Sequence, residues 1–182
     1  GADVAVADLR AVNGFVHVID DTLLPLNVAQ VALAGGFTDL VSAVTNSDPV
    51  PASLAGTAAP VPVIDALSQD TLAPLTVFAP TDAAFMAAFP GGVPTNDGAA
   101  LLGVLGLHVI PSPVPVRAAD LPTSPNTAVA PLAGSPLSFD VSQMPPTVSV
   151  TNGGTTAGIA VTDVGATNGI VHVIDTVLLE GN

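Results

Sequence analysis

The three histidines of the sequence, His17, His108 and His172, are the residues best suited to metal binding or acid–base chemistry. Each stands alone in an apolar stretch, without a second histidine or a glutamate at the spacing that zinc sites use. Serine, histidine and aspartate all occur, but no Gly-x-Ser-x-Gly elbow marks a nucleophile. Asp20 and Asp21 could hold calcium only if loop carbonyls joined them, because EF-hand spacing is absent. The sequence therefore predicts no enzyme activity, no metal site and no cofactor.

The histidine near the C-terminus lies in a segment with the period of a strand. Successive side chains of a strand point to opposite faces, so His172 and Asp175 lie on opposite sides and form a poor acid–base pair. Buried polar groups need hydrogen-bond partners. We therefore interpret Asn168, His172 and Asp175 as internal hydrogen-bonding residues.

The composition excludes several classes of partner. The net charge is −13, and Arg10 and Arg117 are the only Lys or Arg residues. Nothing could neutralise a run of phosphates, so nucleic acid is excluded as a partner and anionic membrane surfaces are disfavoured. No apolar run reaches the roughly 20 residues of a membrane span, and no basic leader is present, so an exported protein would have lost its leader. The absence of Cys, Trp, Tyr and Lys, with abundant Ala, Gly, Pro and Val, suggests a microbial source.

Hydrophobic periodicity separates a helical half from a β half. Alternation around residues 4–6 and 16–19 predicts two strands. From Asn27 the spacing is helical, with Gly35 and Gly36 dividing two short helices that Asn27 and Thr38 can cap. Further helices are predicted at 63–72, from 81–82 to 89, and at 98–105, and residues 46–62 read as a loop. Strands are predicted at 75–80, 107–110, 114–116, 128–132, 137–141, 147–151, 158–162 and 170–179. Helices first and strands later predict an α+β domain with an antiparallel sheet.

One segment occurs twice. Asn13-Gly14-Phe15-Val16-His17-Val18-Ile19-Asp20 returns 155 positions later as Asn168-Gly169-Ile170-Val171-His172-Val173-Ile174-Asp175, and flanking residues share the register. The chain therefore holds one whole repeat and the tail of another.

Three landmarks in order resemble the fasciclin domain family. Leu75-Thr76-Val77-Phe78-Ala79-Pro80-Thr81-Asp82-Ala83-Ala84-Phe85 resembles the first signature box, and Asn168 to Leu179 resembles the second. His108 matches an intervening Tyr-His segment, with Leu107 in place of the tyrosine. The signature residues are Thr76, Phe78, Pro80, Thr81, Asp82, Phe85, His108, Asn168, Gly169, His172 and Asp175. The resemblance covers a complete domain at residues 27–182, preceded at residues 1–26 by the C-terminal strands of another.

This resemblance implies a wedge of two mainly antiparallel β-sheets with N-terminal helices. It also implies a secreted or cell-surface adhesion module of a tandem-repeat protein, whose partners are neighbouring fasciclin domains, copies of itself, a matrix protein or a glycan. Integrin recognition does not carry over, because the sequence has no Arg-Gly-Asp and Leu107 replaces the family tyrosine.

A structural role is the alternative function. The strand Phe15, Val16, His17, Val18 and Ile19 is apolar, and a bare edge of this kind invites association. It can be a remnant packed on the complete domain, the end of a preceding domain, or a donor strand that completes a neighbouring subunit. The last case gives a head-to-tail polymer. We expect residues 1–26 to pair with β-structure supplied from outside that segment.

Overall fold

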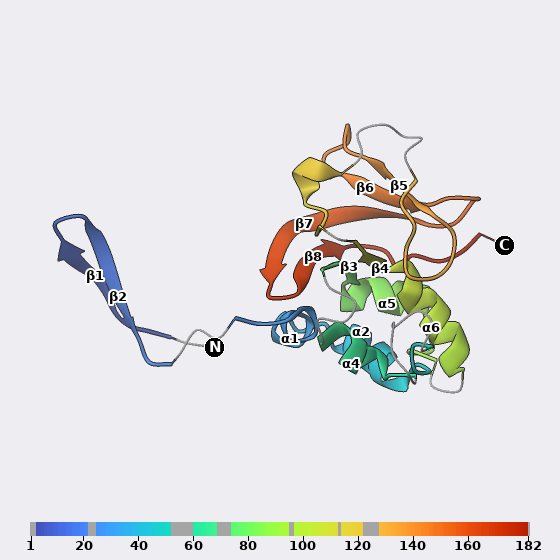
Figure 1. Ribbon diagram of the computed structural model, residues 1–182, viewed down its shortest axis with the longest axis horizontal. Helices are drawn as coiled ribbons and strands as arrows, with labels where there is room; N and C mark the ends of the chain where they lie inside the picture. The colour runs from blue at the N-terminus through green and yellow to red at the C-terminus, as the bar shows by residue number, and fades with distance from the viewer. Residues whose placement is uncertain are drawn as a thin grey trace.

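The computed structural model describes residues 3–21, 25–51, 60–68, 74–94, 97–112, 114–121 and 128–181. The helices are α1 (Val28–Ala34), α2 (Thr38–Asn46), α4 (Val63–Ser68), α5 (Asp82–Ala88) and α6 (Gly98–Leu107), with a 3-10 turn η1 at Ala118–Asp120. The strands are β1 (Val4–Ala11), β2 (Gly14–Ile19), β3 (Leu75–Pro80), β4 (Val109–Pro111), β5 (Leu137–Asp140), β6 (Thr147–Val150), β7 (Thr156–Ala166) and β8 (Gly169–Ile174). Figure 1 shows a helical layer against the sheet, and the β1–β2 hairpin drawn apart from both.

The sheet has the strand order β4-β3-β8-β7-β6-β5. All neighbours are antiparallel except β3 and β8, which pair in parallel from Leu75↔Gly169 to Pro80↔Ile174. The first residues of β7 pair with β6 and the rest with β8, so β7 joins two halves of the sheet. The predicted α+β class with mainly antiparallel β-structure is confirmed.

Two apolar clusters cover the two faces of the central strands. One joins the helices to β3 and includes Val171 of β8. The other lies among β5, β6 and β7 and includes Phe78 and Ile174. Val171 and Ile174 thus belong to different clusters, as the predicted alternation requires. Because β8 is covered on both faces, its apolar residues form a continuous run.

Several predicted boundaries are wrong. Residues 114–116 form no strand, and 128–132 contribute a single bridge, Val129↔Leu137. Leu107 ends α6, so the strand predicted there begins at Val109, while β7 is longer and β8 shorter than predicted. Thr38 is not a cap: it is the first residue of α2, whose N-cap Phe37 makes no side-chain bond. Parts of the loop predicted at 46–62 and of the helix predicted at 63–72 lie outside the described residues.

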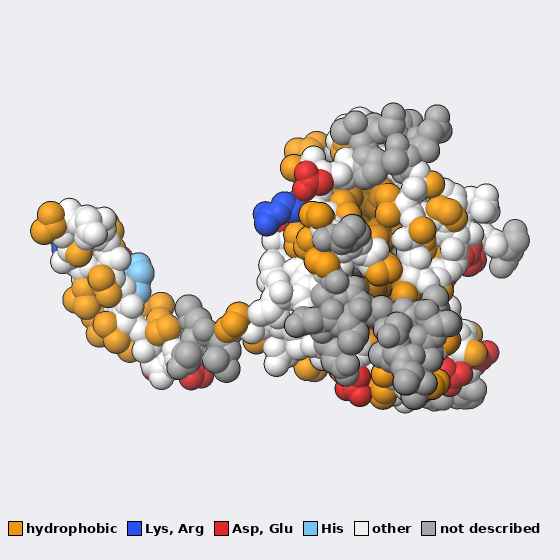
Figure 2. Space-filling model, viewed as in Figure 1, with side chains coloured by type: hydrophobic (Ala, Val, Ile, Leu, Met, Phe, Trp, Pro, Cys, Tyr) orange, Lys and Arg blue, Asp and Glu red, His pale blue; other side chains and the backbone are white. Residues whose placement is uncertain are grey.

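The N-terminal segment forms its own antiparallel hairpin. β1 pairs with β2 from Val4↔Ile19 to Ala11↔Gly14. The expectation that residues 1–26 pair with β-structure supplied from outside that segment stays a prediction. All described residues of both strands are exposed, and Figure 2 shows hydrophobic side chains along the hairpin. The outer edge of β2 carries no further strand in the part of the chain that is described.

The segment that leads from the hairpin into α1 is bound to the β7–β8 turn. Thr167 N donates to Leu26 O at 2.9 Å, and Val28 N donates to Asn168 Oδ1 at 2.9 Å. Asn27 caps α1 as predicted and forms a capping box with Gln30. The start of the helical layer is therefore fixed to the sheet by backbone and side-chain bonds.

Candidate functional site

The residues of the first box lie on β3 and at the start of α5. Thr76 is fully buried, and its Oγ1 accepts a hydrogen bond from Val116 N at 2.8 Å. Phe78 is also buried, with its ring centre 5.8 Å from Phe139 and 5.5 Å from His172. Pro80 ends β3, and Phe85 packs in the helical cluster. The strand part of the box thus forms the centre of the core.

Thr81 and Asp82 each stabilise a helix N-terminus, but not the same helix. Thr81 caps α5, with Oγ1 accepting from Ala84 N at 3.2 Å. Asp82 instead reaches α2, where Oδ2 accepts from Thr38 Oγ1 at 2.6 Å and Oδ1 from Asp39 N at 3.1 Å. The hydrogen bond from the Thr38 hydroxyl holds the pKa of Asp82 below its usual value. The carboxylate therefore supplies the side-chain cap that Phe37 cannot.

We expect Asp82→Ala to lower the free energy of unfolding by about 1–2 kcal/mol, because α2 loses its cap. Asp82→Asn keeps a carbonyl oxygen for Asp39 N and should recover part of the loss. In the wild type this contribution is present above the unfolded carboxyl pKa of 3.8 and is lost as pH falls below it. Urea denaturation at pH 7 measures both variants, and an alanine variant as stable as the wild type would contradict the cap.

His108 follows α6 and joins it to the C-terminal segment. Its Nε2 accepts from Leu178 N at 2.9 Å, so the ring proton sits on Nδ1, which donates to Val104 O at 2.8 Å. Burial lowers the pKa of His108 to about 4. The ring is therefore neutral at physiological pH, and protonation at Nε2 would break the bond to Leu178. His108 acts as a connector between two elements 70 residues apart.

This histidine makes stability sensitive to mild acid. The folded pKa of about 4 lies below the ordinary 6.5, so the unfolded chain binds the proton first. Stability is then complete above pH 6.5 and falls between pH 6.5 and 4, by at most about 1.4 kcal/mol per pH unit. Unfolding midpoints across this window, with an NMR titration of the imidazole, measure the effect. An imidazole of His108 that titrates near 6.5 would contradict it.

The second box lies in the β7–β8 turn and β8. Asn168 is buried, with Oδ1 accepting from Val28 N and Nδ2 donating to Leu67 O at 2.8 Å. Gly169 lies so close to Leu75 that a β-carbon would overlap its backbone. Asp175 is exposed rather than internal, although its Oδ1 accepts from Gly158 N at 2.7 Å. The box thus ties β8 to its neighbours by backbone contact as well as by side chains.

His172 is completely buried on the β8 face that meets Phe78. Asp163 N donates to Nδ1 at 3.3 Å, so the ring proton sits on Nε2 and is donated to Val116 O at 2.9 Å. We expect His172→Ala to cost about 1–3 kcal/mol, because both backbone groups lose their partner. His17→Ala, at the matching position of the exposed hairpin, is the control. Thermal unfolding that is equal for the two variants would contradict a structural role for His172.

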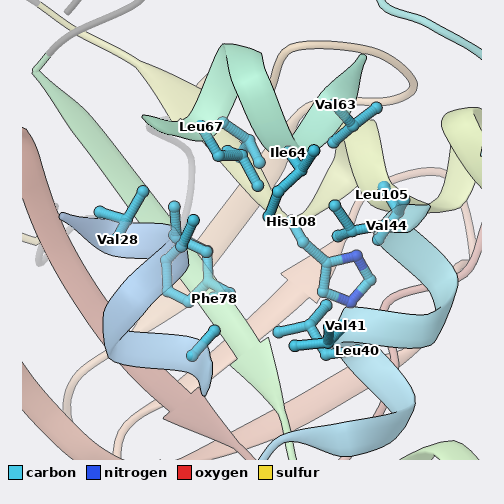
Figure 3. Close-up of a pocket in the computed structure, with 14 residues that line it drawn as sticks. Val28, Leu40, Val41, Val44, Val63, Ile64, Leu67, Phe78, Leu105 and His108 are labelled. Carbon is cyan, nitrogen blue, oxygen red and sulfur yellow. The ribbon is translucent and has the colours of Figure 1, made fainter. Parts of the chain in front are cut away.

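A small enclosed cavity lies beneath the helices, next to His108 and Phe78 (Figure 3). Its volume is about 30 Å³, and apart from His108 its lining is apolar, from α1, α2, α4, α6, β3 and β4. A cavity that binds even benzene needs about 150 Å³. The space is therefore a packing gap rather than a ligand site.

The signature residues do not converge on one reactive group. The structure disperses them among β3, α5, the end of α6, the β7–β8 turn and β8, and among them only Phe78 and His172 are in ring contact. Within the described ranges, no group of three His, Cys, Asp or Glu residues could hold a metal, and every buried side-chain N or O atom has a hydrogen-bond partner. No described helix has both the length and the apolar character of a membrane span.

Sequence reasoning missed the partners of these side chains. Val116, Val28, Leu67 and Leu178 contribute only backbone groups, which carry no signal in residue type. Thr38 is the exception, since a hydroxyl at a helix start indicates capping. Thr38 correctly marks the start of α2, but its hydroxyl donates to Asp82 instead of accepting from the helix backbone.

Comparisons with known proteins agree with this geometry. The model of the fasciclin domain matches residues 36–180. Two proteins of Synechocystis sp. are similar: protein sll1483 is 34% identical over 161 residues, covering 85% of this chain and 73% of its own length, and the uncharacterized protein sll1735 is 32% identical over 158 residues, covering 85% and 98%.

A solved structure of a FAS1 domain pair from the insect cell adhesion molecule fasciclin I has the same fold. Its TM-score is 0.69 at 20% identity, and the likeness covers 98% of this chain, which spans 60% of that one. The covered part thus extends beyond the residues that the family model matches. The chain belongs to the fasciclin domain family.

Proposed function

We propose that this chain is a non-catalytic, extracellular adhesion module of a tandem-repeat surface protein, which mediates cell–cell, cell–matrix or surface attachment. The observation that carries the proposal is that the polar signature residues bond to the fold itself, as His108, Asn168 and His172 do. Residues committed to the core leave the outer surface and loops for recognition. A matrix protein, a glycan or a neighbouring fasciclin domain would be the partner.

The repeat arrangement is part of this proposal. Residues 1–26 are taken as the C-terminal strands of a preceding repeat and residues 27–182 as a complete domain. Support comes from the β1–β2 hairpin, whose pairs repeat those of β7–β8 at every position given for both. The similar insect structure is a domain pair from a cell adhesion molecule.

The adhesion role can be tested by immobilising the chain and measuring its binding to cells, to matrix proteins and to a glycan array. We expect saturable binding that disappears when the fold is lost, with heat-denatured chain as the control. Binding that persists in the denatured chain, or a folded monomer that retains none of these ligands, would refute adhesion.

A second function, a structural subunit that self-assembles head to tail through its N-terminal strands, has one observation in its favour. Exposed apolar side chains run along both strands of the hairpin, and its edge is bare within the described residues. Light scattering of the chain over a range of concentrations tests it. A mass that grows with concentration for the full chain, and not after deletion of residues 1–26, would favour assembly; a constant monomer mass would exclude it.

A further inference from the structure

The two hairpins of the chain have the same internal structure. Both ladders shift register at the same two places, and a residue within the second shift has a positive φ in each, 58° at Asp8 and 59° at Asp163. Asp8 N donates to His17 Nδ1 at 3.2 Å, as Asp163 N donates to His172 Nδ1 at 3.3 Å. The identity therefore extends from sequence to backbone conformation and to individual bonds.

Their surroundings differ. In the domain, β8 lies between β7 and β3, and Ile170, Val171 and Ile174 are at most 5% exposed. In the hairpin, the apolar side chains of both strands are between 36% and 61% exposed: Val4, Val6, Leu9, Phe15, Val16, Val18 and Ile19. β8 therefore has a neighbouring strand at both edges, whereas β2 has a described neighbour, β1, at one edge only.

The missing partner of β2 can be described from the strand that β8 has. Leu75 N donates to Asn168 O, and Thr81 N donates to Ile174 O. Because backbone groups alternate along a strand, every second residue of β8 from Asn168 points its backbone toward β3. At the equivalent positions, Asn13, Phe15, His17 and Ile19, the backbone groups face the outer edge of β2, where no described strand pairs with them.

Two side chains add specificity to this edge. Asn168 bonds to the N–H at the start of α1 and to the carbonyl of Leu67 at the end of α4, whereas Asn13, at the same position, is exposed and has no hydrogen bond to a described residue. His172 Nε2 donates to a loop carbonyl, whereas His17 Nε2 makes no such bond in the described part. The His17 ring is already oriented within the hairpin, because its Nδ1 accepts from Asp8 N.

We propose that the outer edge of β2 is a strand-acceptor site for the preceding fasciclin repeat of the same protein. The bound strand runs parallel to β2 in the register of β3 on β8, and places an apolar residue with an aromatic ring beside His17. Asn13 then receives a helix N–H and donates to a helix carbonyl, and His17 Nε2 donates to a loop carbonyl of that repeat. This inference rests on the tandem arrangement proposed above and specifies its contact surface.

The residue types at the edge of β2 and the low stability of an isolated hairpin favour a strand of a further repeat as the occupant. Natural edge strands are protected by lysine, proline or inward charges, and β2 has none of these at residues 14–19. A two-stranded hairpin alone is marginally stable in water, so a third strand and a packed face are needed. A strand like β3, with its attached domain, supplies both.

The test is an extended chain in which residues 27–157 precede residue 3, so that the hairpin stands where β7 and β8 of the added repeat would be. Hydrogen exchange is measured at the amides of Phe15, His17 and Ile19. We expect exchange at least about 100-fold slower than in the 182-residue chain, because the amides enter a buried ladder. In the matched control, residues 27–181 precede residue 3, so the added repeat has its own hairpin and these amides should stay fast.

Three outcomes would contradict the proposal. An added segment that stays unfolded, or unchanged exchange in the extended chain, shows that the hairpin cannot complete a repeat. Protection that appears in the 182-residue chain alone as its mass doubles would identify a second copy as the occupant.

Asn13→Ala should lower the melting temperature of the added repeat and leave that of the 182-residue chain unchanged. None of these readouts involves cells or glycans, so a failed adhesion assay and a failed strand acceptor remain separate results.

Discussion

Asn168→Ala lowers the free energy of unfolding by about 2–4 kcal/mol, because two buried backbone groups lose their partner at once. Val28 N, at the start of α1, donates to Asn168 Oδ1, and Asn168 Nδ2 donates to Leu67 O of α4. Both bonds cross long stretches of sequence and join the β7–β8 turn to two helices. Their loss therefore weakens the contact between the helical layer and the sheet rather than one local turn.

The chain contains its own control for this change. Asn13 occupies the same position in the β1–β2 hairpin and is exposed, so Asn13→Ala should alter stability by no more than about 0.5 kcal/mol. Urea denaturation followed by far-ultraviolet circular dichroism compares the two variants. Equal losses would mean that Asn168 owes its effect to turn propensity and not to its two bonds.

Gly169→Ala destabilises the fold by about 3 kcal/mol, which is a large fraction of the roughly 5–15 kcal/mol total stability of a typical domain. A β-carbon at Gly169 would overlap the backbone carbonyl of Leu75, which cannot move without breaking the parallel ladder between β3 and β8. Overlap with backbone is harder to relieve than overlap with a flexible side chain. The expected consequence is separation of β3 from β8 at the centre of the sheet.

Gly14→Ala is the matched substitution in the hairpin, where a β-carbon would meet nothing within 4 Å. It should change stability by no more than about 0.5 kcal/mol. Calorimetry of both variants measures the contrast. A Gly169→Ala variant that melts with the wild type would show that β3 and β8 can separate slightly at no cost.

Local features of the fold could be predicted from the sequence. The Asn27 cap, the strand at 75–80 and the alternation along β8 depend on neighbouring residues, and the structure contains all three. The residues of the signature could be identified through the family resemblance. The core positions of its apolar members Phe78 and Phe85 then follow from apolar periodicity.

Long-range hydrogen bonds could not be predicted. Asp82 lies beside the cap residue Thr81, so its type suggested the nearer helix, yet it caps α2 in a segment 43 residues earlier. Residues 114–116 have the composition of a strand, but Val116 N donates to Thr76 Oγ1 and Val116 O accepts from His172 Nε2. Side chains thus take the backbone groups that a sheet ladder would have used.

The bond between Leu26 and Thr167 has a mechanical consequence. Tension applied through the N-terminal segment reaches the β7–β8 turn directly at Leu26, where Thr167 N donates to its carbonyl. Beyond the C-terminal end of β8, Leu178 N donates to His108 Nε2 and Leu179 N donates to Thr155 Oγ1. A pulling force between the two ends of the module therefore acts on the hydrogen bonds at Leu26, Leu178 and Leu179, which flank the short strand β8.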